Sequence, residues 1–168
     1  MDGTRHARML AIVFDLVEGE TAKRYAAEIA AGNLPPTVTP YMSTFEVMAL
    51  AKTGENAAAL KKFESVWGAM SDFGADADWE GWNPEDKGEE GYEFYGRPFA
   101  KSLCHAWSSG PAFLISGTFL GIRPTSDGWK TWEANPDLPD FAPNAKVRVP
   151  TKAGTLEVTL QNGKALIP

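Results

Sequence analysis

The sequence has little of several residue types that define common functional classes. It contains one cysteine (Cys104), two histidines and no apolar run long enough to cross a bilayer. A single cysteine excludes an intrachain disulfide framework. Lys and Arg total 16 against 22 Asp and Glu and form no basic block, so we expect neither a nucleic-acid partner nor a membrane partner. No His, Cys and Asp cluster has metal-ligand spacing, so we also expect no metal and no other cofactor.

What is present fits a globular chain of 168 residues, with 43% hydrophobic and 23% charged residues. That length allows one domain, or one domain and a small second one. The first residues, MDGTRHA, lead into an amphipathic segment and do not form a secretory signal. We therefore identify no signal peptide, and the sequence assigns no compartment.

The first 72 residues carry a helical period. Thr4 or Asp2 is a candidate N-cap, Gly54 is a candidate C-cap, and Pro35-Pro36 makes a rigid break between helices. Apolar residues recur at intervals of three and four, which predicts helical hairpins joined by short turns. The first predicted helix runs from this N-cap to before Gly19. The next three cover about residues 20–31, 41–52 and 56–70.

Residues 73–100 lose this period and are rich in Gly, Asp, Glu, Trp and Tyr. A loop of this length in a small protein is more often functional than not. A helical pattern resumes at Ser102, and we expect Pro111 to divide or kink that helix.

After Gly121 the apolar residues alternate with polar ones, which is the period of a strand. Turn signals at residues 152–154 and 162–163 separate the alternating segments. The pattern predicts a small antiparallel sheet of about four strands. The fold class is therefore α+β, with helical hairpins first and strands last.

Three segments together are similar to the end of the catalytic domain in family 78 glycoside hydrolases, the α-L-rhamnosidase-like enzymes. Residues 67–84 (WGAMSDFGADADWEGWNP) resemble the stretch that carries the family's general base. Residues 95–107 (YGRPFAKSLCHAW) resemble the start of its last barrel helix. Residues 119–136, from FLGIRPT through Gly128-Trp129 to Pro136, resemble its link into a C-terminal β-domain.

This resemblance implies a partial (α/α)6 barrel over residues 1–121 and the start of a C-terminal β-sandwich over residues 122–168. It also implies inverting hydrolysis of terminal α-L-rhamnosides or similar glycosides, with Glu80 as the general base. Asp76 and Asp78 replace the family's threonines, and nothing matches the upstream segment that supplies the general acid. The resemblance therefore describes a truncated, C-terminal portion of such an enzyme, which we expect to be inactive alone.

The candidate site centres on Glu80. Trp79 and Trp82 flank it, and we expect them to desolvate the carboxylate, to raise its pKa and to offer flat faces to a sugar. We expect Tyr95 and His105 to complete the substrate-binding residues. The acids of the same loop are expected to form a solvated face; they are Glu85, Asp86, Glu89, Glu90 and Glu93.

Two alternatives remain open. One alternative to a catalytic fragment is a non-catalytic carbohydrate-binding or structural remnant. The other is half of a split enzyme, which would need a complementing N-terminal segment or self-association. A half-barrel lacks neighbours for its apolar faces, so we expect poor burial of Phe14, Phe45 or Trp67. A second carboxylate opposite Glu80, from Asp76, Asp78 or Glu93, would favour catalysis.

Overall fold

The structure is a computed structural model that describes residues 4–136, 144–161 and 164–166. The chain divides into two compact units, Met1–Pro111 and Ala112–Pro168. The division lies earlier than the boundary expected after residue 121. One reason is that Leu120 and Ile122 both belong to the core of the second unit.

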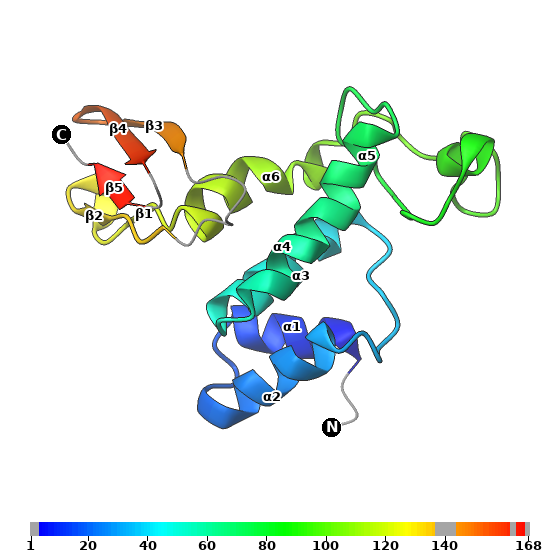
Figure 1. Cartoon of the computed structure of the whole chain (residues 1–168), viewed down its shortest axis with the longest axis horizontal. Helices are drawn as coiled ribbons and strands as arrows, with labels where there is room; N and C mark the ends of the chain where they lie inside the picture. The colour runs from blue at the N-terminus through cyan, green and yellow to red at the C-terminus, as the bar shows by residue number, and fades with distance from the viewer. Residues whose placement is uncertain (1–3, 137–143, 162–163, 167–168) are drawn as a thin grey trace. The chain divides into compact units, whose positions relative to one another are not determined.

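Helices dominate the first unit (Figure 1). Helix α1 packs against α2 and α3, and α3 packs against α4, so the predicted helical hairpins up to residue 72 are confirmed. Within the part of the chain that the structure describes, no helix combines the length and apolar character needed to cross a bilayer. The elements are α1 (Arg5–Val13), α2 (Gly19–Ala30), α3 (Pro40–Lys52), α4 (Asn56–Phe63), a π-helical turn η1 (Glu64–Gly68) and α5 (Ala69–Asp72).

The helix ends follow from capping residues in the sequence. The side chain of Thr4 accepts a hydrogen bond from the Ala7 N–H, as predicted for the N-cap of α1. Helix α3 ends at Lys52, and Gly54 follows its C-cap with φ +88°, a value that glycine adopts without a steric penalty. Helix α1 stops at Val13, short of Gly19, because the backbone becomes left-handed at Asp15 (φ +55°).

A buried ion pair fixes the proline-containing segment between α2 and α3. Arg5 is 6% exposed, and its Nη1 lies 2.6 Å from Oε1 of Glu46. The same guanidinium donates to the carbonyl oxygens of Leu34 and Pro35, and Thr37 Oγ1 donates to the other oxygen of Glu46. The rigid break at Pro35-Pro36 is therefore anchored to both α1 and α3.

The prediction that a helix resumes at Ser102 is wrong. Residues 102–105 are not helical, and a single 3₁₀ turn, η3 (Ala106–Ser108), precedes α6 (Gly110–Phe113) and the π-helical η4 (Leu114–Phe119). Pro111 neither divides nor kinks a helix. It stands in the first turn of α6, where its missing N–H leaves no helical hydrogen bond unmade.

Burial of the three aromatic residues expected to lack neighbours is mixed. Phe14 is 60% exposed, as predicted, and Phe45 is half-buried. The prediction is wrong for Trp67, which is 6% exposed. Its indole Nε1 donates to the carbonyl oxygen of Ser108 at 2.8 Å, so the segment after the long loop covers this ring.

The described residues of the second unit form two small antiparallel sheets, where one was predicted. Helices followed by antiparallel strands confirm the α+β class in its coarse form. Its buried core is formed by Leu120, Ile122, Val158 and Leu160. The predicted turn at residues 162–163 lies outside the described residues. Strands β1 (Arg123–Pro124) and β2 (Trp132–Glu133) pair with each other, and β3 (Ala145–Thr151), β4 (Gly154–Gln161) and β5 (Lys164–Leu166) form the second sheet in that order.

Candidate functional site

Two stretches of the long irregular segment lie side by side and build the candidate site. The Glu80 N–H donates to the Ser102 carbonyl oxygen at 2.9 Å, and the His105 N–H donates to the Asp78 carbonyl oxygen at 2.7 Å. These bonds explain why residues 102–105 are not helical, since their backbone groups are used to bind residues 78–80. The pairing brings Glu80 and His105 to the same place.

Both oxygens of the Glu80 carboxylate accept hydrogen bonds. Tyr95 Oη donates to Oε1 at 2.7 Å, and the Ser102 N–H donates to Oε2 at 2.9 Å. The bond from Tyr95, then that from Ser102, lowers the pKa of Glu80 below its ordinary value, and His105 adds a smaller attraction. The predicted upward shift of this pKa is therefore wrong, because these donors outweigh the desolvation.

A tight turn places Tyr95 against Glu80. The backbone N–H and carbonyl groups of Phe94 and Arg97 bond each other in both directions, at 3.1 and 3.0 Å. The central residues of the turn, Tyr95 and Gly96, both have positive φ, at +53° and +69°. Two central residues with positive φ define the type I′ hairpin turn. A left-handed tyrosine is unusual, and here this conformation accompanies the bond to the carboxylate.

The indoles of Trp79 and Trp82 are buried, which contradicts their predicted role as open sugar platforms. They are 3% and 6% exposed. Phe73 meets Trp79 at 5.8 Å and Trp82 at 5.1 Å between ring centroids, in edge-to-face contacts, and Tyr92 lies 5.3 Å from Trp79. These aromatic rings pack against one another and support the loop that carries Glu80.

Lys101 closes this aromatic cluster. Its Nζ lies 4.8 Å from the ring centroid of Trp79 and donates to the carbonyl oxygens of Gly81 and Gly91. Burial lowers the pKa of Lys101. Because Ser102 is the next residue, the lysine that holds the cluster together also fixes the peptide N–H that binds Glu80.

Two glycines are required by close packing in the same loop. A Cβ on Gly81 would lie 2.3 Å from the ring of Phe94, and a Cβ on Gly91 would lie 2.4 Å from the ring of Phe73. Any side chain at these positions would displace an aromatic ring. Since Phe94 begins the turn that contains Tyr95, Gly81 indirectly determines the position of the tyrosine.

A row of partly exposed aromatic rings continues from His105. The imidazole meets the Trp107 ring edge-to-face at 4.6 Å, and the Trp107 indole stacks on Tyr41 at 5.3 Å with an interplanar angle of 18°. Trp107 is 47% exposed and Tyr41 is 40% exposed. The open faces expected of Trp79 and Trp82 are thus offered by different residues.

The other acids of the loop lie mostly at the protein surface. Among the described residues, no carboxylate is one of the groups that shift the pKa of Glu80. The acids predicted to form a solvated face are exposed or, at Asp86, half-buried. In the same described part of the chain, no group of three or more His, Cys, Asp and Glu side chains is arranged to hold a metal ion.

Sequence reasoning missed several residues of the site. Ser102 acts through its backbone N–H, so its residue type carries no signal. Lys101 lies within a segment of recognised resemblance, but its contact with the aromatic cluster depends on tertiary packing. Tyr41 is distant from Glu80 in sequence and belongs to no recognisable motif. Trp107 lies within a segment of recognised resemblance, but its exposure depends on the tertiary packing of Tyr41.

Chemically, the site holds a carboxylate that is ionised at neutral pH beside an imidazole and a flat aromatic surface. Each carboxylate oxygen has two acceptor positions, and only one bond to each oxygen is described here. The free positions are suited to a water molecule or a hydroxyl group.

Comparison with known proteins gives a likeness of fold. No family model and no curated protein matches the sequence. The solved structure of a GH78 family rhamnosidase of Bacillus sp. GL1 matches with a TM-score of 0.72 and 24% sequence identity. The chain has a GH78-like fold. The match covers 93% of this chain but only 16% of the rhamnosidase chain, and at this identity it concerns the fold alone.

Proposed function

We propose that this chain is part of a glycoside hydrolase and supplies its general base, Glu80. The observation that carries the proposal is the Glu80 carboxylate, fixed by Tyr95 and by the Ser102 N–H within a GH78-like fold. The proposed substrates are terminal α-L-rhamnosides or similar glycosides. The proposed architecture is a partial (α/α)6 barrel, with the sequence lacking the rest of that barrel.

In the proposed reaction, ionised Glu80 takes a proton from a water molecule held at a free position of its carboxylate. The water oxygen forms a bond to the anomeric carbon, and the bond to the leaving oxygen breaks on the opposite face. An acid protonates that leaving oxygen, so the product has the inverted configuration. Inverting enzymes place this acid roughly 6.5–9.5 Å from the base.

We infer that the acid comes from a complementing segment. Nothing in the sequence matches the upstream segment that supplies the general acid in the family it resembles. The chain also spans only 16% of the rhamnosidase that it matches. His105 would contact sugar hydroxyl groups beside the base, and Tyr95 would orient the carboxylate.

A second candidate is a non-catalytic carbohydrate-binding remnant. The observation that favours it is the exposed stack of Trp107 on Tyr41 next to His105. Aromatic faces of this kind offer apolar area to the C–H groups of a sugar without any requirement for an acid. Such a remnant would bind a sugar and show no turnover in any context.

The test restores the chain to a full-length context that contains an acid-bearing segment. There, Glu80→Gln should lower kcat for an aryl α-L-rhamnoside by about 10²–10⁴-fold with little change in KM, because it removes the base and keeps the volume. Glu89→Gln, an exposed acid of the same loop with no proposed catalytic role, is the matched control. Azide should restore some turnover of the Glu80→Gln variant. Full activity of this variant would exclude Glu80 as the base.

The isolated chain separates the two candidates further. We expect no release of nitrophenol from the aryl rhamnoside by the chain alone, with either Glu or Gln at position 80. If the restored protein is also inactive while the isolated chain binds L-rhamnose, the non-catalytic candidate is favoured. Turnover by the isolated chain would show that its acid lies within these 168 residues.

A further inference from the structure

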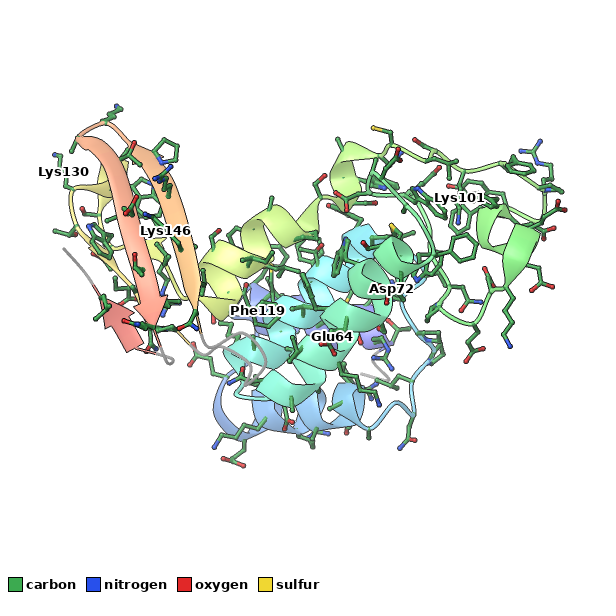
Figure 2. All side chains as sticks on the ribbon, turned by 45° about the horizontal axis from the view of Figure 1, so that its top comes forward. Glu64, Asp72, Lys101, Phe119, Lys130 and Lys146 are labelled. Carbon is green, nitrogen blue, oxygen red and sulfur yellow. The ribbon has the colours of Figure 1, made fainter. Side chains whose placement is uncertain are left out.

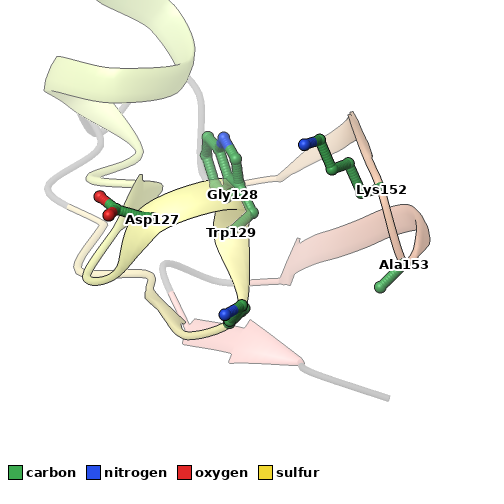
Figure 3. A pocket seen from close by; sticks show the side chains of 6 residues that line it. Asp127, Gly128, Trp129, Lys152 and Ala153 are labelled. Atoms are coloured by element: carbon green, nitrogen blue, oxygen red, sulfur yellow. The ribbon is translucent and has the colours of Figure 1, made fainter.

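The second unit has a cleft of its own, formed between two turns (Figure 3). Its volume is about 460 Å³, within the range of small-ligand sites. One wall is the turn at residues 127–130, which includes the 3₁₀ turn η5 (Asp127–Trp129), and the other is the tip of the β3–β4 hairpin. The lining residues are Asp127, Gly128, Trp129, Lys130, Lys152 and Ala153.

The first wall holds a tryptophan in an unfavourable backbone conformation. Trp129 has φ +61°, a left-handed value that is rare for a bulky residue. The surrounding turn fixes it there, since the Thr131 N–H donates to Ser126 Oγ at 2.9 Å and the Thr125 N–H donates to the Thr131 carbonyl oxygen at 2.9 Å. Backbone strain that the surrounding structure maintains is concentrated at ligand-binding sites.

The second wall is equally well defined. Thr151 Oγ1 donates to the Gly154 carbonyl oxygen at 2.7 Å, and the Ala153 N–H donates to Thr151 Oγ1 at 3.2 Å. This leaves Lys152 at the tip of the hairpin. Figure 3 shows the Lys152 side chain extending toward the indole of Trp129, with the Asp127 carboxylate on the other side of the turn.

The two lysines of the cleft differ from the other cations of this unit. Lys146 and Arg148 both pair with Glu157, and Arg123 pairs with Glu133. Neither Lys130 nor Lys152 has a carboxylate within 4.0 Å among the described residues. Both are exposed, so the cleft presents two positive charges that pair with no described carboxylate, beside one half-buried indole.

We propose that this cleft binds an acidic sugar, a hexuronate residue of a saccharide. The indole face of Trp129 would cover the C–H face of a sugar ring, and the ammonium groups of Lys130 and Lys152 would bind carboxylates of the saccharide. The site is independent of Glu80 and involves no chemical step.

The experiment uses the whole chain and follows the assigned indole N–H signal of Trp129 by two-dimensional NMR. Tri-galacturonate should shift this signal, and its fully methyl-esterified form, which keeps the rings and loses the charges, should not. Lys130→Gln and Lys152→Gln should each weaken binding by roughly two- to fivefold, the range for one exposed ion pair. The double variant should bind more weakly than either single variant.

Lys146→Gln is the matched control, because it removes the same charge from the same unit outside the cleft and should leave affinity unchanged. Glu80→Gln should also bind normally, so failure of the proposed base and failure of this site are distinguishable. Equal affinity for the acid and its ester would overturn the proposal, as would normal binding by the double lysine variant. Inorganic phosphate that shifts the signal as strongly as the trimer would show a simple anion site and overturn the assignment to a sugar.

Discussion

The phenol of Tyr95 and the carboxylate of Glu80 are 15 residues apart in sequence and 2.7 Å apart in space. The bond starts from a type I′ turn, in which Tyr95 and Gly96 have φ values of +53° and +69°. It ends on a segment whose backbone pairs with residues 102–105. The tyrosine therefore holds one carboxylate oxygen while the Ser102 N–H holds the other. Figure 2 shows the many side chains of this loop near Lys101, away from the helices around Glu64.

Replacing Tyr95 tests whether its hydroxyl lowers the pKa of Glu80. Tyr95→Phe should raise that pKa toward the ordinary value for glutamate, about 4.3. The Ser102 amide signal, followed by NMR during acid titration, reports the ionisation of Glu80. Tyr25→Phe, a tyrosine in α2 that contacts arginines, is the control. An unchanged midpoint in Tyr95→Phe would contradict this assignment.

The lowered pKa of Glu80 also makes the free energy of unfolding depend on pH. A carboxyl group whose pKa is lowered on folding contributes stability that is fully present above its unfolded pKa and is lost as pH falls through the folded pKa. The wild-type chain should therefore lose this contribution on acidification below about pH 4.3. Tyr95→Phe should lose less over the same window, as measured by urea unfolding at several pH values.

The buried pair of Arg5 and Glu46 should be the most sensitive ion pair of the first unit. Glu46→Ala leaves Arg5 buried without its carboxylate, and breaking a buried pair in this way costs about 3–5 kcal/mol of unfolding free energy. Glu20→Ala removes the carboxylate of the exposed Glu20–Lys23 pair and should cost less than about 1 kcal/mol. Urea denaturation of both variants makes the comparison, and equal losses would contradict it.

Gly81 should not tolerate a side chain. Gly81→Ala places a Cβ 2.3 Å from the Phe94 ring, and overpacking of this kind costs about 1–3 kcal/mol. The displaced ring should also disturb the turn at Tyr95, so the Ser102 amide signal should move. Gly68→Ala is the control, because its nearest neighbour atom is 3.8 Å away and alanine suits a helical position. Thermal unfolding followed by near-ultraviolet circular dichroism compares the two variants.

The local part of the fold was predictable from the sequence. Helical period, the Thr4 cap and the Gly54 stop predicted the first unit up to residue 72, because these signals act over a few residues. The helix prediction for residues 102–105 failed for a non-local reason. Their backbone groups bond residues 78–80, and that pairing overrides the apolar pattern that favoured a helix.

The candidate site was predictable in position and not in environment. The resemblance drew attention to Glu80 and Tyr95, which the structure brings together. The tryptophans beside Glu80 in sequence turned out to be buried, because a cluster of aromatic rings drawn from residues 73–92 encloses them. The tryptophans therefore predicted a raised pKa for Glu80, whereas hydrogen bonds from Tyr95 and Ser102 lower it.

The contacts of Lys101 should make the structure of the long loop insensitive to salt. Its ammonium group donates to two peptide carbonyl oxygens and lies over indole rings, and Asp86 acts on it without a described ion pair. Dissolved ions screen exposed charge pairs strongly and buried contacts much less. The loop that holds Glu80 should therefore keep its shape at ionic strengths that loosen exposed pairs such as Lys52–Asp15.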